Sequence, residues 1–94
     1  MRYRVLTVGT DVNLLATRQA LLISRGYDSL IATNQDFDEK LLSGTFDLVI
    51  FSVTLSQEEK RQTQTKLPAG TRTLVLDTLV WPEELLHMVA EALE

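Results

Sequence analysis

The most strongly patterned stretch of the chain is an apolar run in its middle. Residues 46–55 read Phe-Asp-Leu-Val-Ile-Phe-Ser-Val-Thr-Leu, with β-branched and aromatic side chains between polar flanks. Such a run, too short for a helical repeat, is typical of a strand buried on both faces in the middle of a parallel sheet. Ligands of parallel sheets bind outside the carboxyl ends of the strands. We therefore look for function first at Ser52 to Ser56.

Strand-like and helix-like segments alternate through most of the chain. The first predicted helix has Asp11 or Asn13 as its cap and Gly26 as its stop, and the last helix begins at Pro82. This alternation predicts right-handed crossovers and a parallel sheet with helices on its faces, formed by a single domain over residues 1–94. The remaining predicted elements are strands at 3–8, 29–33 and 71–76 and helices at 13–25 and 37–42.

The segment 57–66 departs from this alternation. Ser56 and Glu59 have the spacing of a capping box, which favours a helix start. The segment contains no apolar residue, however, so a helix there would have no face with which to cover the sheet. The pattern leaves two alternatives, a solvated short helix and a loop.

The composition of the chain excludes several classes of partner and of functional site. The net charge of −4 supplies no positive field for nucleic acid or anionic lipid, so we expect partners of neither kind. The chain has no cysteine, which excludes disulfides, thiolate metal sites and thiol nucleophiles and favours a reducing cytoplasm. We also find no signal peptide and no membrane span in the sequence.

Three segments together resemble the receiver domain of bacterial two-component response regulators. They are the first strand and helix ending in Ser-Arg-Gly-Tyr at 24–27, the central run at 46–55, and the start of the last helix, Pro-Glu-Glu-Leu-Leu at 82–86. The resemblance implies a flavodoxin-like, doubly wound α/β fold. Shortened to four strands, the sheet would have the order 2-1-3-4, with the first and last helices on one face and the second helix on the other.

The same resemblance indicates that the family's chemistry is lost. Its phosphate-accepting aspartate falls on Ser52, and its acidic pair falls on Gly9 and Thr10, which leaves only Asp11 nearby as a possible ligand for Mg²⁺. Its fifth-strand lysine falls on Trp81, and the short connection between Leu76 and Leu79 has no room for a fourth helix and a fifth strand. We expect no catalytic residue, no metal and no cofactor.

Two interpretations of the strand ends remain open. In the first, a weak divalent-ion or phosphate site persists there, with donors from the backbone of Gly9 and Thr10. In the second, Asp11 caps a helix, Ser52 fills space and Asp77 ends a strand. The only tryptophan, Trp81, either anchors a partner or plugs the end of a small core. The residues of the residual site are Gly9, Thr10, Asp11, Ser52, Asp77 and Thr78.

A polar segment at 57–66 would leave one face of the sheet with little to cover it, and the fourth strand would be an open edge. Bare apolar surface and open edges favour association, so the sequence predicts a two-fold homodimer. The competing interpretation is that the alkyl stems of the polar segment and the last helix cover the sheet. The expected interaction surface comprises Val49, Phe51, Val53, Leu74, Val75, Leu76 and Trp81.

The sequence thus predicts a cytoplasmic, non-enzymatic signalling module that resembles a receiver but takes no phosphate. It would act by binding itself or another signalling protein. The alternative is a receiver that keeps a phosphate- or ligand-responsive switch at the strand ends.

Overall fold

The computed structural model describes residues 2–93; Met1 and Glu94, the two ends of the predicted domain, lie outside them. Strands and helices alternate along the whole described chain. They are β1 (Arg4–Val8), α1 (Val12–Ser24), β2 (Asp28–Ala32), α2 (Phe37–Leu41), β3 (Leu48–Phe51), α3 (Gln57–Thr65), β4 (Arg72–Val75) and α4 (Pro82–Leu93).

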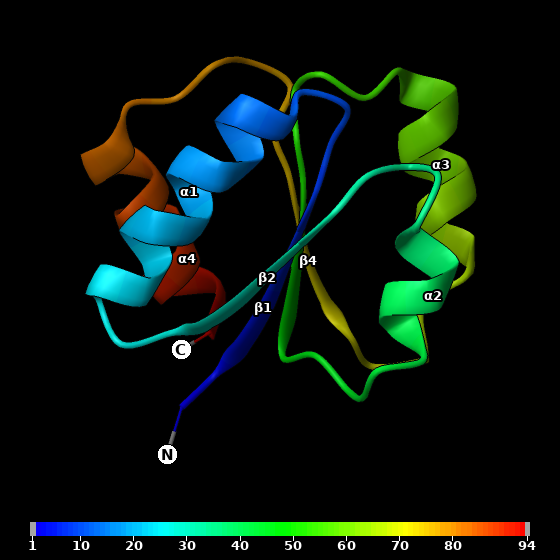
Figure 1. Cartoon of the computed structure of the whole chain (residues 1–94), viewed down its shortest axis with the longest axis horizontal. Helices are drawn as coiled ribbons and strands as arrows, with labels where there is room; N and C mark the ends of the chain where they lie inside the picture. The colour runs from blue at the N-terminus through cyan, green and yellow to red at the C-terminus, as the bar shows by residue number, and fades with distance from the viewer. Residues whose placement is uncertain (1, 94) are drawn as a thin grey trace.

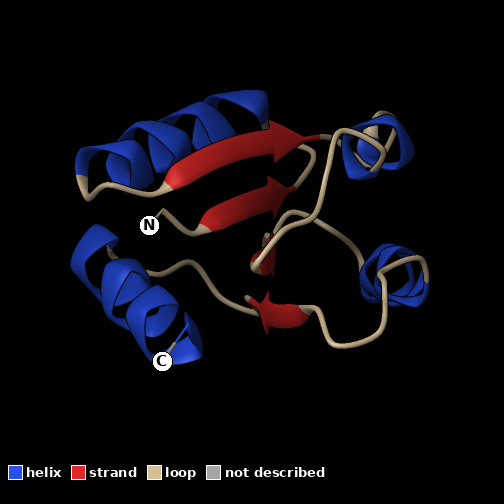
Figure 2. Ribbon diagram, turned by 90° about the horizontal axis from the view of Figure 1, so that it is seen from below, coloured by secondary structure: helices blue, strands red, loops and turns tan. Residues whose placement is uncertain are grey.

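All four strands form one parallel sheet in the order β2-β1-β3-β4. Helices α1 and α4 cover one face, and α2 and α3 cover the other (Figures 1 and 2). This arrangement confirms the predicted α/β fold, its strand order and the sides assigned to the helices. Six residues, 76–81, connect β4 to α4, so the described chain has no further helix or strand between them, as predicted.

The central strand β3 divides the interior into two cores. Its four residues, 48–51, are all fully buried, which confirms the predicted buried strand. Leu48 and Ile50 pack with Leu22 and Leu85 on the side of α1 and α4. Alternate side chains of a strand point to opposite faces, and accordingly Val49 and Phe51 pack in the second cluster with Leu6 and Phe37.

Helix α1 carries one charged residue in its buried stripe. Asp11 is the N-cap, accepting hydrogen bonds from the amides of Asn13 and Leu14 at 3.1 and 3.2 Å. The buried positions of the helix are Leu15, Arg18 and Leu22. Their spacings of three and four residues place all of them on one helical face. A guanidinium group therefore lies between α1 and the sheet.

The segment 57–66 is a helix over most of its length, although it has no apolar residue. Ser56 and Glu59 form the predicted capping box. The face toward the sheet consists of Lys60 and Thr63, which are both buried. A lysine can cover apolar surface with its alkyl stem while its amine finds polar partners. The expectation that this helix would lack a covering face was therefore wrong.

The bare sheet face expected from the sequence was also wrong. Val49 and Phe51 are fully buried and Leu76 is only 2% exposed, because α2 and α3 lie over one face and α4 packs against the other. Val53, Leu74 and Val75 are half-buried. Of the expected interaction surface, only Trp81 is exposed, at 79%, so it does not plug the core either.

Candidate functional site

The carboxyl ends of β1 and β3 lie side by side and bring Ser52 into the interior. The Ser52 amide donates to the Val8 carbonyl at 2.8 Å, which continues the pairing of the two strands by one residue. Ser52 follows the alternation of Leu48 and Ile50, so its side chain belongs to the face covered by α1 and α4. The residue is 1% exposed.

Arg18 reaches Ser52 from α1. Its Nη1 donates a hydrogen bond to Ser52 Oγ at 3.1 Å, and the residue is only 4% exposed. Nη2 is buried and has no hydrogen-bond partner among residues 2–93, and no carboxylate of these residues forms an ion pair with Arg18. Burial lowers the pKa of Arg18, yet a guanidinium keeps its charge at neutral pH. The site thus contains a buried positive charge with one hydroxyl partner.

Ser52 is also connected to the surface through Thr54. The Thr54 hydroxyl donates to Ser52 Oγ at 3.3 Å, and the Thr10 amide donates to Thr54 Oγ1 at 3.0 Å. The Thr10 hydroxyl adds a bond of 3.3 Å to the Thr54 carbonyl. These bonds join the loop after β1 to the loop after β3. Arg18, Ser52, Thr54 and Thr10 form a continuous polar cluster from the core to the surface, which we call the strand-end cluster.

Gly9 closes the space beside Ser52. A Cβ atom at Gly9 would lie 2.9 Å from Ser52 Cβ, closer than real Cβ atoms approach, and it would also be tight against Thr54 Oγ1 at 3.0 Å. An acidic side chain at this position, as in receivers, would have no space without a shift of the β3 end. The glycine at position 9 and the tight packing at Ser52 are therefore parts of one arrangement.

The structure separates the other predicted site residues. Asp11 caps α1, and Thr78 is exposed. Asp77 binds α3, where its Oδ1 accepts from Gln57 Nε2 at 3.1 Å and from Lys60 Nζ at 3.2 Å. The hydrogen bond from Gln57 and then the bond and charge of Lys60 lower the pKa of Asp77. Within residues 2–93, no three histidine or acidic residues are placed to hold a metal ion together.

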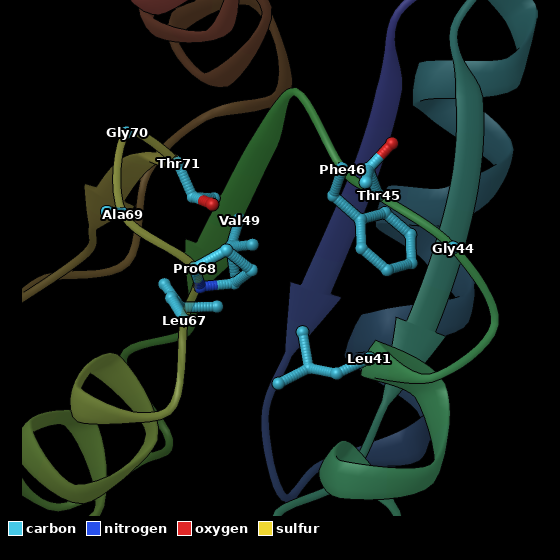
Figure 3. A pocket seen from close by; sticks show the side chains of 10 residues that line it. All are labelled: Leu41, Gly44, Thr45, Phe46, Val49, Leu67, Pro68, Ala69, Gly70 and Thr71. Atoms are coloured by element: carbon cyan, nitrogen blue, oxygen red, sulfur yellow. The ribbon is translucent and has the colours of Figure 1, made fainter.

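A pocket at the opposite end of the sheet is separate from this cluster. It has a volume of about 250 Å³ and lies where the chain enters β3 and β4 (Figure 3). Its lining is mostly apolar and comprises Leu41, Gly44, Thr45, Phe46, Val49, Leu67, Pro68, Ala69, Gly70 and Thr71. It offers no charged group, so it adds nothing to the chemistry at Ser52.

Comparison with solved structures agrees with the fold. One chain in the crystal structure of the histidine kinase ThkA in complex with the response regulator protein TrrA aligns with a TM-score of 0.73 at 19% identity, and the alignment covers 100% of both chains. No protein-family model matches the sequence, and no curated protein matches it either. The four-stranded parallel sheet thus matches a receiver-like, flavodoxin-like fold.

Proposed function

We propose that the protein is a non-catalytic, receiver-like interaction module that takes no phosphate. The observation that carries the proposal is the hydrogen bond of 3.1 Å from Arg18 to Ser52. Phosphoryl transfer to a receiver needs a carboxylate acceptor and an Mg²⁺ held by further carboxylates. Here a hydroxyl replaces the acceptor and a buried cation lies against it. Like charges in a buried site repel strongly, so Arg18 opposes Mg²⁺ binding.

The similar solved structure supports a role in signalling through protein contacts. It is a complex between a histidine kinase and a response regulator. We propose another signalling protein as the partner of this chain, and the absence of cysteine supports a cytoplasmic location. None of the helices within residues 2–93 is long and apolar enough to cross a membrane.

Phosphoryl donors test the main proposal. The ¹⁵N-labelled protein is mixed with Mg²⁺ and acetyl phosphate, and separately with Mg²⁺ and beryllofluoride. We expect no mass increase and no change in the amide signals of residues 9–11 and Ser52. The variant Ser52→Asp restores the acceptor alone, and we expect it to stay unmodified because Arg18 and Gly9 remain. Modification of the unaltered chain would overturn the proposal.

Self-association remains part of the proposal, but with a smaller surface than the sequence predicted. With the expected apolar face covered, the free edge of β4 supports association best. Arg72 and Thr73 are exposed there, and β4 pairs only with β3 among the described strands. Edge strands pair readily with a second chain. Light scattering or sedimentation that shows a monomer at high micromolar concentration would remove this part of the proposal.

One observation favours a second candidate function, a response to small anions. The unpartnered Nη2 of Arg18 and the equally unpartnered Thr7 Oγ1 are buried on the same face of the sheet. A ligand that binds the native state raises the melting temperature. Inorganic phosphate at constant ionic strength would then stabilise the protein, and Arg18→Met would abolish the effect, whereas the exposed control Arg61→Met would not. The absence of any stabilisation would eliminate this candidate.

A further inference from the structure

The connection between β4 and α4 presents two large apolar side chains to solvent. Leu79 is 71% exposed and Trp81 is 79% exposed, whereas Val80 between them packs against the core under α4. The connection replaces the elements that the resemblance to receivers would place after the fourth strand. The side chains of Leu79 and Trp81 are therefore not used to fill space inside this fold.

Trp81 is held in a fixed position at the start of α4. Its carbonyl accepts the Leu85 amide at 2.9 Å, which makes it the residue immediately before the first helical turn. Pro82 follows and restricts the backbone of Trp81 to extended conformations. A rigid apolar anchor loses little conformational entropy on binding.

This position is also unfavourable for a tryptophan in terms of folding alone. The residue before a helix is preferably Ser, Thr, Asp or Asn, whose side-chain oxygen accepts a free amide of the first turn. The indole of tryptophan has no acceptor to offer. The fold thus gains no cap and little buried apolar area from Trp81, which is consistent with a role in binding.

The charges beside this anchor are acidic. Residues 77–84 contain Asp77, Glu83 and Glu84 and no lysine or arginine. Glu83 and Glu84 are exposed, and neither forms an ion pair with another described residue. Lys60 contacts this segment, but its amine is buried and bound to Asp77 and to the Leu76 carbonyl. The apolar anchor therefore has a negative rim.

We propose that Leu79 and Trp81 form a docking site for a basic, amphipathic segment of a partner protein. The apolar stripe of that segment would cover the two side chains, and its lysine or arginine residues would face Glu83 and Glu84. Complementary charge steers association and excludes wrong partners. The inference rests on the proposed function as an interaction module and names the surface and the chemistry of the partner.

The same charges exclude a second copy of this chain as the occupant. A two-fold contact centred on Trp81 would bring the Glu83 and Glu84 pairs of two copies together. Like charges across an interface are unfavourable. Self-association at the β4 edge and docking at Trp81 are thus separate contacts.

The single tryptophan allows a direct measurement. The probe is an amphipathic peptide of about 18 residues, five helical turns, made of leucine and lysine. We expect it to shift the emission of Trp81 to shorter wavelength, and the binding to weaken as salt is raised. The same peptide with glutamate in place of lysine is expected to leave the emission unchanged. A shift that appears with protein concentration alone would assign the site to a second copy and overturn the proposal.

Variants separate binding from folding. Trp81→Ser supplies a capping oxygen, so we expect a higher melting temperature together with a loss of peptide affinity of about tenfold or more, measured by the anisotropy of a labelled peptide. The double variant Glu83→Gln with Glu84→Gln should weaken peptide binding. The control is the double variant Glu39→Gln with Glu58→Gln, which changes the net charge equally at exposed sites on α2 and α3 and should not weaken it. Equal affinity in Trp81→Ser would refute the docking site. The phosphoryl-donor experiment does not depend on this result.

Discussion

The guanidinium of Arg18 donates a hydrogen bond to the hydroxyl of Ser52 just after β3. This is the carboxyl end of the sheet, where a doubly wound fold places its ligands. The buried charge at this end of the sheet is the positive charge of Arg18, although the chain as a whole carries a net charge of −4. A site that binds Mg²⁺ requires the opposite, a set of carboxylates. The buried charge at Ser52 is therefore opposite in sign to that of a carboxylate site for Mg²⁺.

Arg18 is expected to lower the stability of the fold rather than raise it. An unpaired buried charge is costly, and apolar replacements of buried charged groups are often neutral or stabilising. We expect Arg18→Met to leave the free energy of unfolding unchanged or to raise it by about 1 kcal/mol. Arg18→Ala should lower it, because a cavity remains beneath α1. Urea unfolding of both variants measures this, and a marked loss in Arg18→Met would contradict it.

Position 9 requires a glycine because its backbone packs closely against the end of β3. We expect Gly9→Ala to lower the free energy of unfolding by about 1–3 kcal/mol, because the new methyl group would overlap Ser52 Cβ. The double variant Gly9→Ala with Ser52→Gly removes that atom and should recover part of the loss. A double-mutant cycle in chemical denaturation tests the coupling. Strict additivity would show that the contact is not the cause.

The capping box holds the start of α3. The Ser56 hydroxyl accepts the Glu59 amide at 3.1 Å, and the Glu59 carboxylate accepts the Ser56 amide at 2.9 Å. We expect Ser56→Ala to lower the free energy of unfolding by about 1 kcal/mol. Ser43→Ala, at an exposed serine outside any helix start, is the control and should change little. Similar losses in both variants would argue against the cap.

The contact of Asp77 with α3 should depend on pH. Gln57 first and Lys60 second lower the pKa of Asp77 in the folded protein below its ordinary value of 3.8. A carboxyl group with a depressed folded pKa contributes stability above its unfolded pKa and loses it as the pH falls through the folded pKa. The difference in melting temperature between the unaltered chain and Asp77→Asn should therefore be constant near neutral pH and shrink below about pH 4. A difference that persists in acid would contradict this explanation.

The sequence predicted the fold well because the fold depends on apolar periodicity. The run around Leu48 to Phe51 and the alternation of elements around it were enough to predict the strand order. Ser52 and Thr10 of the strand-end cluster were among the predicted site residues, whereas Arg18 was not. Its position three residues after Leu15 and four before Leu22, within the apolar stripe, was the signal that could have revealed it.

The covering of the second sheet face could not be predicted from apolar pattern. Helix α3 is held by Lys60, whose amine bonds to the Leu76 carbonyl at 2.8 Å and to Asp77 Oδ1 at 3.2 Å. Such contacts depend on which polar side chain meets which strand end, and periodicity does not encode that. The error about α3 led directly to the error about a bare sheet face.

Helix α3 contributes no residue to the apolar cluster beneath it. Local opening of a segment requires less free energy than global unfolding when few apolar contacts are broken. Detachment of α3 would therefore expose this face of the sheet while α1, α4 and the sheet stay folded. Helix α3 is therefore a segment that can open locally when its polar contacts break. The amide protons of α3 should exchange with solvent before those of β3.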